Sequence, residues 1–174
     1  MRRVVVNIET TGVDPDEEHR IVELAAVELN GGRRSVRSLH TYINPMRLIE
    51  PYAAAIHGIT DEFLTDAPAF ADIADEFVSL IRGAEFVAHN AEFPLEFINS
   101  ELERLGYEPI EVLCSGVTDT LQLARSIRPN LKNDLDTLCK DLRIKPSRPG
   151  LMGAALDADL LATIYLKFLH RQLH

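Results

Sequence analysis

The chain has 174 residues and a formal net charge of −9 at pH 7. Hydrophobic residues make up 46% of it and charged residues 26%, which is typical of a soluble globular protein with little room for a disordered tail. The negative net charge argues against binding of nucleic acid through general electrostatic attraction, because neutralising phosphates needs clustered Lys and Arg. A nuclease is still compatible, since bound metal ions can supply positive charge. We expect one domain spanning residues 1–174.

The beginning of the chain predicts a cytoplasmic protein. Met1 to Arg3 leads directly into Val4 to Val6, an apolar run too short for a signal-peptide core or a membrane span. The two cysteines, Cys114 and Cys139, lack the spacing of metal ligands, so we expect no zinc site and no disulfide framework. We interpret both as small buried apolar residues. No membrane partner is expected.

Strand and helix patterns alternate along the chain after an initial group of strands. Asn30-Gly31-Gly32 lies between two apolar runs and predicts a hairpin. The predicted strands are residues 4–8, 21–29, 35–43, 85–88 and 112–117. The predicted helices are a short segment from Pro51, a helix from Thr60 to just before Gly83, and residues 91–105, 119–126, 133–142 and 153–169. Three antiparallel strands followed by alternating elements predict an α/β fold, with about five strands in a mixed sheet flanked by helices.

Asn7 and Glu9 are candidates for chemistry because they lie two residues apart on the first predicted strand. Their side chains therefore share one face of the sheet. If the last helix packs beside this strand, Asp157 could share a cation with Glu9, since Mg²⁺ takes oxygen ligands from separate elements. Spacing alone supports this weakly, because acidic residues on helices are usually solvated.

A family resemblance adds to this interpretation. Residues 6–12, Val-Asn-Ile-Glu-Thr-Thr-Gly, resemble the first motif of the DnaQ-like (DEDDh) 3′–5′ exonucleases, which begins Asp-x-Glu-Thr-Thr-Gly. Further segments resemble the same family, in particular its proofreading epsilon subunits of bacterial DNA polymerase III: residues 19–28, 57–63, 89–93, 117–121, 135–139 and 153–158. The resemblance covers about 150 residues in order. It implies an RNase H-like exonuclease fold.

In active members of this family, four carboxylates hold two Mg²⁺ or Mn²⁺ ions and a histidine is the general base. The resemblance places these five catalytic positions at Asn7, Glu9, Pro94, Met152 and Asp157. Three of them lack the family's residue: Asn7 and Pro94 replace aspartates, and Met152 replaces the histidine. The charge of the site falls from about −4 to about −2, so two divalent ions would be poorly neutralised. We expect weak or absent metal binding, with Glu9 and Asp157 as the remaining ligands.

Neighbouring residues carry weaker expectations. Glu92 and Glu96 flank Pro94 and could replace its lost carboxylate only if the helix start changed; as solvated carboxylates they need no such role. The resemblance assigns nucleotide binding to these residues: Thr10, Thr11, Gly12, His57 and Asn90. His57 could equally make a structural hydrogen bond. Arg125, Arg128 and Lys132 form a basic cluster that fits a solvated surface better than a phosphate site. Asp119 and Asp136 are expected to cap helices or to orient backbone amides.

Three functions remain open from the sequence. The first is an impaired or inactive relative of the epsilon subunit that still binds a single-stranded DNA 3′ end or a DNA polymerase catalytic subunit. The second is a working metal-dependent proofreading exonuclease that uses Glu9, Asp157 and a recruited Glu92 or Glu96. The third is a purely structural protein-interaction subunit. The substitutions at three catalytic positions favour the first, because loss of a general base alone typically costs about 10²–10⁴-fold in rate.

Overall fold

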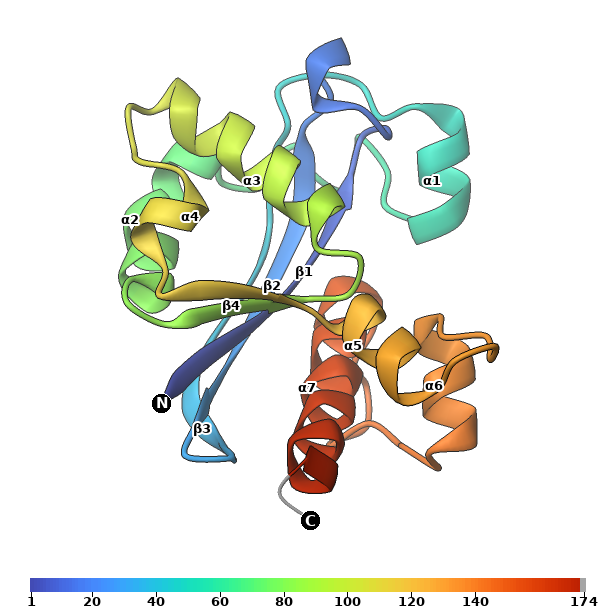
Figure 1. The fold of residues 1–174 in the computed structure, drawn as a ribbon. Coiled ribbons are helices and arrows are strands. Elements are labelled where there is room, and N and C mark those ends of the chain that lie inside the picture. Colours follow the sequence, from blue (N-terminus) through green and yellow to red (C-terminus); the bar gives the residue numbers. More distant parts are fainter. Residues whose placement is uncertain (173–174) are drawn as a thin grey trace.

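The computed structural model describes residues 1–172 and is built around one five-stranded mixed sheet (Figure 1). The strands are β1 (Arg2–Thr10), β2 (Ile21–Asn30), β3 (Arg33–Tyr42), β4 (Glu85–Ala88) and β5 (Gly116–Asp119). Their order across the sheet is β3-β2-β1-β4-β5. The pairs β1–β2 and β2–β3 are antiparallel, whereas β4 lies parallel to β1 and β5 lies parallel to β4. The predicted mixed sheet is confirmed.

Helices cover both faces of this sheet, as Figure 1 shows. The helical elements are η1 (Pro15–Glu17), α1 (Pro51–His57), α2 (Phe70–Ile81), α3 (Glu92–Arg104), α4 (Ile110–Leu113), α5 (Thr120–Ile127), α6 (Leu135–Asp141) and α7 (Gly153–Gln172). The helices α2, α3 and α4 pack on one face through the largest core cluster. The long helix α7 packs on the other face and is joined there by α5 and α6. In the described part of the chain, no helix is both long and apolar enough to cross a bilayer.

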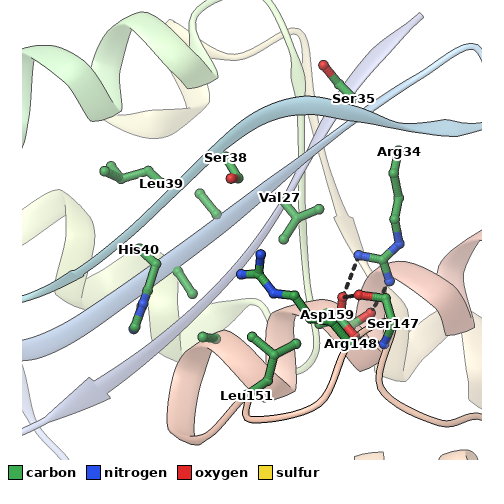
Figure 2. Close-up of a pocket in the computed structure, with 13 residues that line it drawn as sticks. Val27, Arg34, Ser35, Ser38, Leu39, His40, Ser147, Arg148, Leu151 and Asp159 are labelled. Carbon is green, nitrogen blue, oxygen red and sulfur yellow. Dashed lines mark hydrogen bonds and ion pairs between the residues drawn. The ribbon is translucent and has the colours of Figure 1, made fainter.

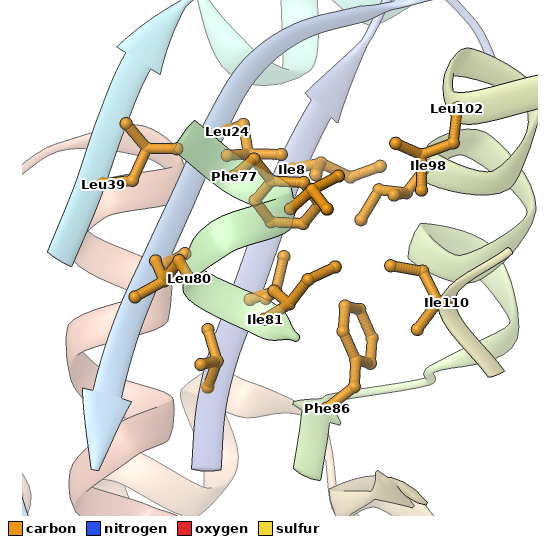
Figure 3. Close-up of a cluster of buried hydrophobic side chains, with 14 of the residues drawn as sticks. Ile8, Leu24, Leu39, Phe77, Leu80, Ile81, Phe86, Ile98, Leu102 and Ile110 are labelled. Carbon is orange, nitrogen blue, oxygen red and sulfur yellow. The ribbon is translucent and has the colours of Figure 1, made fainter. Parts of the chain in front are cut away.

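The alternation of side chains along β1 assigns one face to the core and the other to the site. Val4, Val6 and Ile8 point into the cluster shared with α2 and α3, where Figure 3 shows Ile8 near Phe77. Val5 points the other way and packs with α7. Each fully buried aliphatic side chain stabilises the fold by about 1.5–3 kcal/mol. By the two-residue period of a strand, Asn7 and Glu9 lie on the same face as Val5, beside α7.

The predicted hairpin is confirmed at Asn30-Gly31-Gly32. Gly31 and Gly32 both adopt positive φ angles, 57° and 80°, which side-chain-bearing residues rarely take. The turn joins β2 to β3 in antiparallel pairing. It makes β3 an edge strand of the sheet.

The predicted helix start at Thr60 is wrong. Residues 61–66 form turns, and α2 begins only at Phe70. Asp61 accepts a hydrogen bond from the Ile49 amide at 2.9 Å, so its carboxylate fixes a neighbouring loop and caps no helix. The helix begins after Pro68, where the Asp72 carboxylate accepts a hydrogen bond from the Ala69 amide at 2.9 Å.

The start of the predicted fifth strand is also wrong. Residues 110–113 form the short helix α4, and the strand begins at Gly116. Pro109 precedes α4 with a φ of −68°, which is the angle that a proline ring fixes and that suits a helix start. Ile110 and Leu113 are buried, whereas Val112 is exposed, which is the spacing of a single helical turn.

Candidate active site

The register of β1 and β2 brings two glutamates side by side on the face covered by α7. Glu9 is directly opposite Glu23, and Asn7 is directly opposite Ala25. Opposed residues in an antiparallel pair have Cβ atoms only about 5 Å apart. Glu23 was not among the site residues predicted from the sequence, although it lies within a matching motif, residues 19–28. It is 1% exposed, so a second carboxylate lies buried next to Glu9.

The buried Glu23 carboxylate connects β2 to β3 and to the start of α7. His40 on β3 places its Nε2 2.9 Å from Glu23 Oε1, and the Ala154 amide donates to Glu23 Oε2 at 3.1 Å. Gly153 comes so close to this carboxylate that a Cβ atom there would lie 2.6 Å from Oε2. Glu23 therefore fixes the first turn of α7 against the sheet.

Asp157 lies one turn along α7 from Ala154, which packs on Ala25 of β2. Burial, the charge of Asp136 and the charge of Glu23 together raise the pKa of Asp157 to about 6. Burial, the charge of Asp157 and the charge of Glu23 raise the pKa of Glu9 to about 7. Each carboxylate thus sits in a poorly solvated place near other negative charges, where the ionised form is disfavoured. Asp157 thus lies near enough to Glu9 for its charge to act on the Glu9 carboxylate.

None of the three substituted positions carries a charged side chain. Asn7 is half-buried and precedes Glu9 on the same face of β1. Pro94 is buried in the first turn of α3, where its missing amide hydrogen costs no helical hydrogen bond. Met152 immediately precedes α7 and is 69% exposed. A thioether is a weak acceptor that takes no proton at neutral pH.

Glu92 and Glu96 are both exposed on the first turns of α3. The negative charges that raise the pKa of Glu9 come from Asp157 and Glu23. Both α3 glutamates therefore fit the solvated role that the sequence analysis gave them.

The loop after β1 is held by a buried network. Thr11 Oγ1 lies 3.0 Å from His19 Nδ1 and also accepts a hydrogen bond from the Arg20 amide at 3.0 Å. Thr10 Oγ1 donates to the Gly12 carbonyl at 2.6 Å. A Cβ atom on Gly12 would lie 2.3 Å from the His19 ring. The hydroxyls assigned to nucleotide binding therefore also hold their own loop, and Gly12 is required by the close approach of His19.

His57 makes the structural hydrogen bonds that were one of its two expected roles. Its Nδ1 accepts from the Ile59 amide at 3.1 Å, which leaves Nε2 to donate to the Thr10 carbonyl at 3.0 Å. This bond joins the end of α1 to the end of β1. His57 therefore holds the end of β1 in place through the Thr10 carbonyl.

Asp119 caps α5 as expected: its Oδ1 accepts from the Leu121 amide at 2.8 Å and from the Asn90 amide at 3.0 Å. Asn90, exposed after β4, has a positive φ of 59°.

The expectation for Asp136 is wrong, because Asp134 caps α6 through the Thr137 amide at 3.0 Å. The side chain of Asp136, in the first turn, instead adds negative charge near Asp157.

Comparisons with known proteins identify the family. A model of the exonuclease family (RNase_T) matches residues 4–165. The chain belongs to the exonuclease family. DNA polymerase III subunit epsilon of Buchnera aphidicola is 45% identical over 171 residues, which cover 95% of this exonuclease-family chain and 73% of that protein. The same subunit of Escherichia coli is 43% identical over 171 residues, with 95% and 70% covered. The resemblance found in the sequence is confirmed.

Solved exonuclease structures share the fold. Exonuclease X in complex with 5′ overhanging duplex DNA superposes with a TM-score of 0.78 at 24% identity, covering 98% of this chain and 93% of that one. The nuclease domain of 3′hExo, a DEDDh family member bound to rAMP, gives a TM-score of 0.76 at 15% identity, with 98% and 92% covered. The predicted RNase H-like architecture is thereby confirmed.

The side chains at the five catalytic positions of this exonuclease-family chain do not supply the oxygen ligands that two hard divalent ions require. Glu9 and Asp157 offer carboxylates and Asn7 an amide oxygen, whereas Pro94 and Met152 offer no hard ligand. Within residues 1–172, no group of three or more His, Cys, Asp or Glu side chains is arranged to hold a metal ion. No hydrolytic step through paired metals follows from this set.

Two of the three cations in the basic cluster, Arg128 and Lys132, form ion pairs with neighbouring carboxylates of this exonuclease-family chain. Arg128 forms an ion pair with Asp141 at 2.5 Å, and Lys132 forms one with Asp134 at 3.4 Å. Surface pairs of this kind leave little net positive charge for a phosphate. The two cysteines are free and half-buried, and burial raises the pKa of the Cys114 thiol to about 11.

Proposed function

We propose that this chain is an epsilon-like 3′–5′ exonuclease-fold protein whose catalysis is impaired or absent. In this proposal it retains a binding role, toward a single-stranded DNA 3′ end or a DNA polymerase catalytic subunit. One observation carries the proposal: Asn7, Pro94 and Met152 stand at the family positions of two carboxylates and a general base, and only Glu9 and Asp157 keep the family's carboxylates. Binding of Mg²⁺ or Mn²⁺ is accordingly proposed to be weak or absent.

The chemistry of the site supports impairment in two ways. Two metal ions suit phosphodiester hydrolysis because one activates the attacking water and the other stabilises the leaving oxygen, which requires several carboxylates. The two remaining carboxylates are disfavoured in their ionised, metal-binding form, since the pKa of Glu9 is raised to about 7 and that of Asp157 to about 6. In addition, the exposed Met152 thioether cannot accept the proton of an attacking water.

A nuclease assay tests the proposal directly. Purified protein is mixed with a 5′-labelled single-stranded oligonucleotide and Mg²⁺ or Mn²⁺, and metal binding is measured by calorimetry on the same sample. We expect no metal-dependent shortening and no tight metal binding. Robust digestion that disappears in Glu9→Gln and in Asp157→Asn would overturn the proposal in favour of an active enzyme. Digestion that persists in both variants would identify a contaminant.

A revertant separates lost chemistry from a changed pocket. The triple substitution Asn7→Asp, Pro94→Asp and Met152→His restores the family's residues. We expect it to gain metal-dependent 3′–5′ digestion, which the further change Glu9→Gln should abolish. A folded triple revertant with no activity would mean that the pocket has changed beyond its ligands. Oligonucleotide binding by the unmodified protein, reduced by changes at His57 and Glu9, would separate DNA binding from a purely structural role.

A further inference from the structure

A hollow lies at the edge of the sheet, on the α7 face and next to the candidate active site. It has a volume of about 150 Å³ and lies between the edge strand β3, the loop that precedes α7, and α7 itself (Figure 2). Its apolar lining includes Ala25 and Val27 of β2 and Ala155 of α7. A cavity of about this size can hold a benzene-sized molecule. It can therefore hold one phosphate group.

Arg148 supplies positive charge to this hollow. It lies in the exposed loop before α7, and Figure 2 shows its guanidinium directed between His40 and Val27. Among residues 1–172, no ion pair holds this guanidinium. The group is planar and always charged, and it presents paired donors that suit phosphate oxygens.

The one carboxylate in the lining is already neutralised. Asp159 is 5% exposed and pairs with Arg34, whose Nη1 lies 2.8 Å from Oδ1. The Ser147 amide donates to Asp159 Oδ2 at 2.8 Å, and the Ser147 hydroxyl donates to Oδ1 at 2.5 Å. Both oxygens of Asp159 are thus occupied. The Arg34 and Asp159 charges cancel, so Arg148 leaves the lining with a net positive charge in a chain that is otherwise strongly acidic.

Hydroxyl and imidazole groups of β3 complete the lining. Ser38 and His40 lie two residues apart and share the face of β3 that borders the hollow. Ser38 is exposed, so its hydroxyl can turn toward a ligand at little cost. His40 is fixed there by its contact with Glu23.

We propose that this hollow binds a phosphate group, either inorganic phosphate or the phosphate of a nucleoside monophosphate. Arg148 forms a bidentate pair with two phosphate oxygens, and Ser38 donates its hydroxyl to a third. The proposed ligand joins β3 to the loop that ends at Met152, four residues after Arg148. This inference does not depend on whether the exonuclease site is active.

Titration with inorganic phosphate tests the site. Amide shifts of the isotope-labelled, metal-free protein are followed by NMR at constant ionic strength, and the titration is repeated with thymidine monophosphate. We expect saturable binding in the millimolar range, with shifts at Ser38, Ser147 and Ala155. Arg148→Gln should weaken binding by about tenfold or more, because it removes charge-assisted hydrogen bonds. Arg148 is exposed, so this variant should fold normally.

Lys145→Gln is the matched control, because Lys145 is an exposed cation of the same loop that does not line the hollow. It should change affinity by less than about twofold, as expected for a screened remote charge. Equal weakening by both variants would overturn the proposal by showing general electrostatic attraction. Absence of saturation, or shifts confined to residues 10–12 after β1, would also overturn it. Tighter binding of the nucleotide than of phosphate would identify a nucleoside monophosphate as the ligand; equal binding would identify the phosphate alone.

Discussion

At the scale of single residues, Glu9 shows how burial beside other carboxylates raises the pKa of a carboxyl group. Its pKa rises from 4.5 to about 7 because of burial, the charge of Asp157 and the charge of Glu23. Between these pH values the folded protein keeps a proton that the unfolded chain has released. The unfolded state then binds fewer protons, so the free energy of unfolding falls as pH rises through this range.

Glu9→Gln should therefore stabilise the metal-free protein above pH 7, where wild-type Glu9 is ionised. We expect a gain of about 1–2 kcal/mol at alkaline pH after allowance for solvent screening, and little change near pH 4.5. Denaturant unfolding with a chelator present, measured at acidic and alkaline pH, checks this. Glu92→Gln, at an exposed position, should show no such difference. An equal effect of Glu9→Gln at both pH values would contradict the charge argument.

Gly12 provides a steric prediction at the same scale. A Cβ atom there would lie 2.3 Å from the ring of His19, which is only 5% exposed and hydrogen-bonded to Thr11. Gly12→Ala should cost about 1–3 kcal/mol in the free energy of unfolding, the usual effect of overpacking. Gly116→Ala is the control, since a Cβ atom there meets nothing within 4 Å. Similar unfolding midpoints for the two variants would show that the His19 loop yields easily.

At the scale of elements, Glu23 joins three of them through one buried carboxylate. Glu23→Ala would leave the Ala154 amide without its acceptor and the His40 ring without its partner. We expect a loss of about 2–4 kcal/mol, whereas Glu23→Gln should cost less because it still accepts from Ala154. Hydrogen exchange should show faster opening of the first turn of α7 in the alanine variant. If instead all core amides accelerated equally and Ala154 showed no extra loss, Glu23 would not be specific to α7.

Elements also show what the sequence could and could not predict. Short-range signals located the Asn30-Gly31-Gly32 hairpin and the first strand, predicted at residues 4–8 and observed at Arg2–Thr10, because turn geometry and apolar runs are local. The partnership of Glu9 with Glu23 was not predicted, since the long connection between β1 and β2 leaves their register undetermined. Val112 and Leu113, the last two residues of the helical turn α4, were mistaken for strand because a short apolar run shows no clear period. Spacing alone supported a site shared by Glu9 and Asp157 only weakly, and the family resemblance strengthened that expectation.

At the scale of the whole molecule, both helical layers pack on one shared sheet, so we propose that residues 1–174 unfold as a single domain. The core clusters on the two faces are linked through adjacent residues of β1, Val4 and Val5. Unfolding followed by far-ultraviolet circular dichroism and by tyrosine fluorescence should give one coincident transition. Tyr165 packs in the α7 layer, and Tyr107 against the α2 and α3 layer, so the tyrosines report on both faces. Two separate transitions would contradict the single-domain proposal.

The distribution of charge over the whole molecule limits how it can hold DNA. The net charge is −9, and a groove between η1 and α3, near the end of β1, is lined by the carboxylates Asp14, Asp16, Glu96 and Glu103. Any binding of single-stranded DNA must then rely on contacts other than phosphate neutralisation. Each neutralised phosphate contributes about −0.7 to the slope of log affinity against log salt concentration.

We therefore expect a slope shallower than about −2 for a labelled oligonucleotide, measured by fluorescence anisotropy over a series of salt concentrations. The double variant Asp16→Lys and Glu96→Lys reverses two charges in this groove. It should bind more tightly, with a slope steeper by about −1.4, because two added lysines can neutralise two phosphates. A wild-type slope of about −4 or steeper would mean that six or more phosphates are neutralised, and the binding surface would then lie away from the acidic groove. Unchanged binding by the double variant would likewise place the DNA elsewhere.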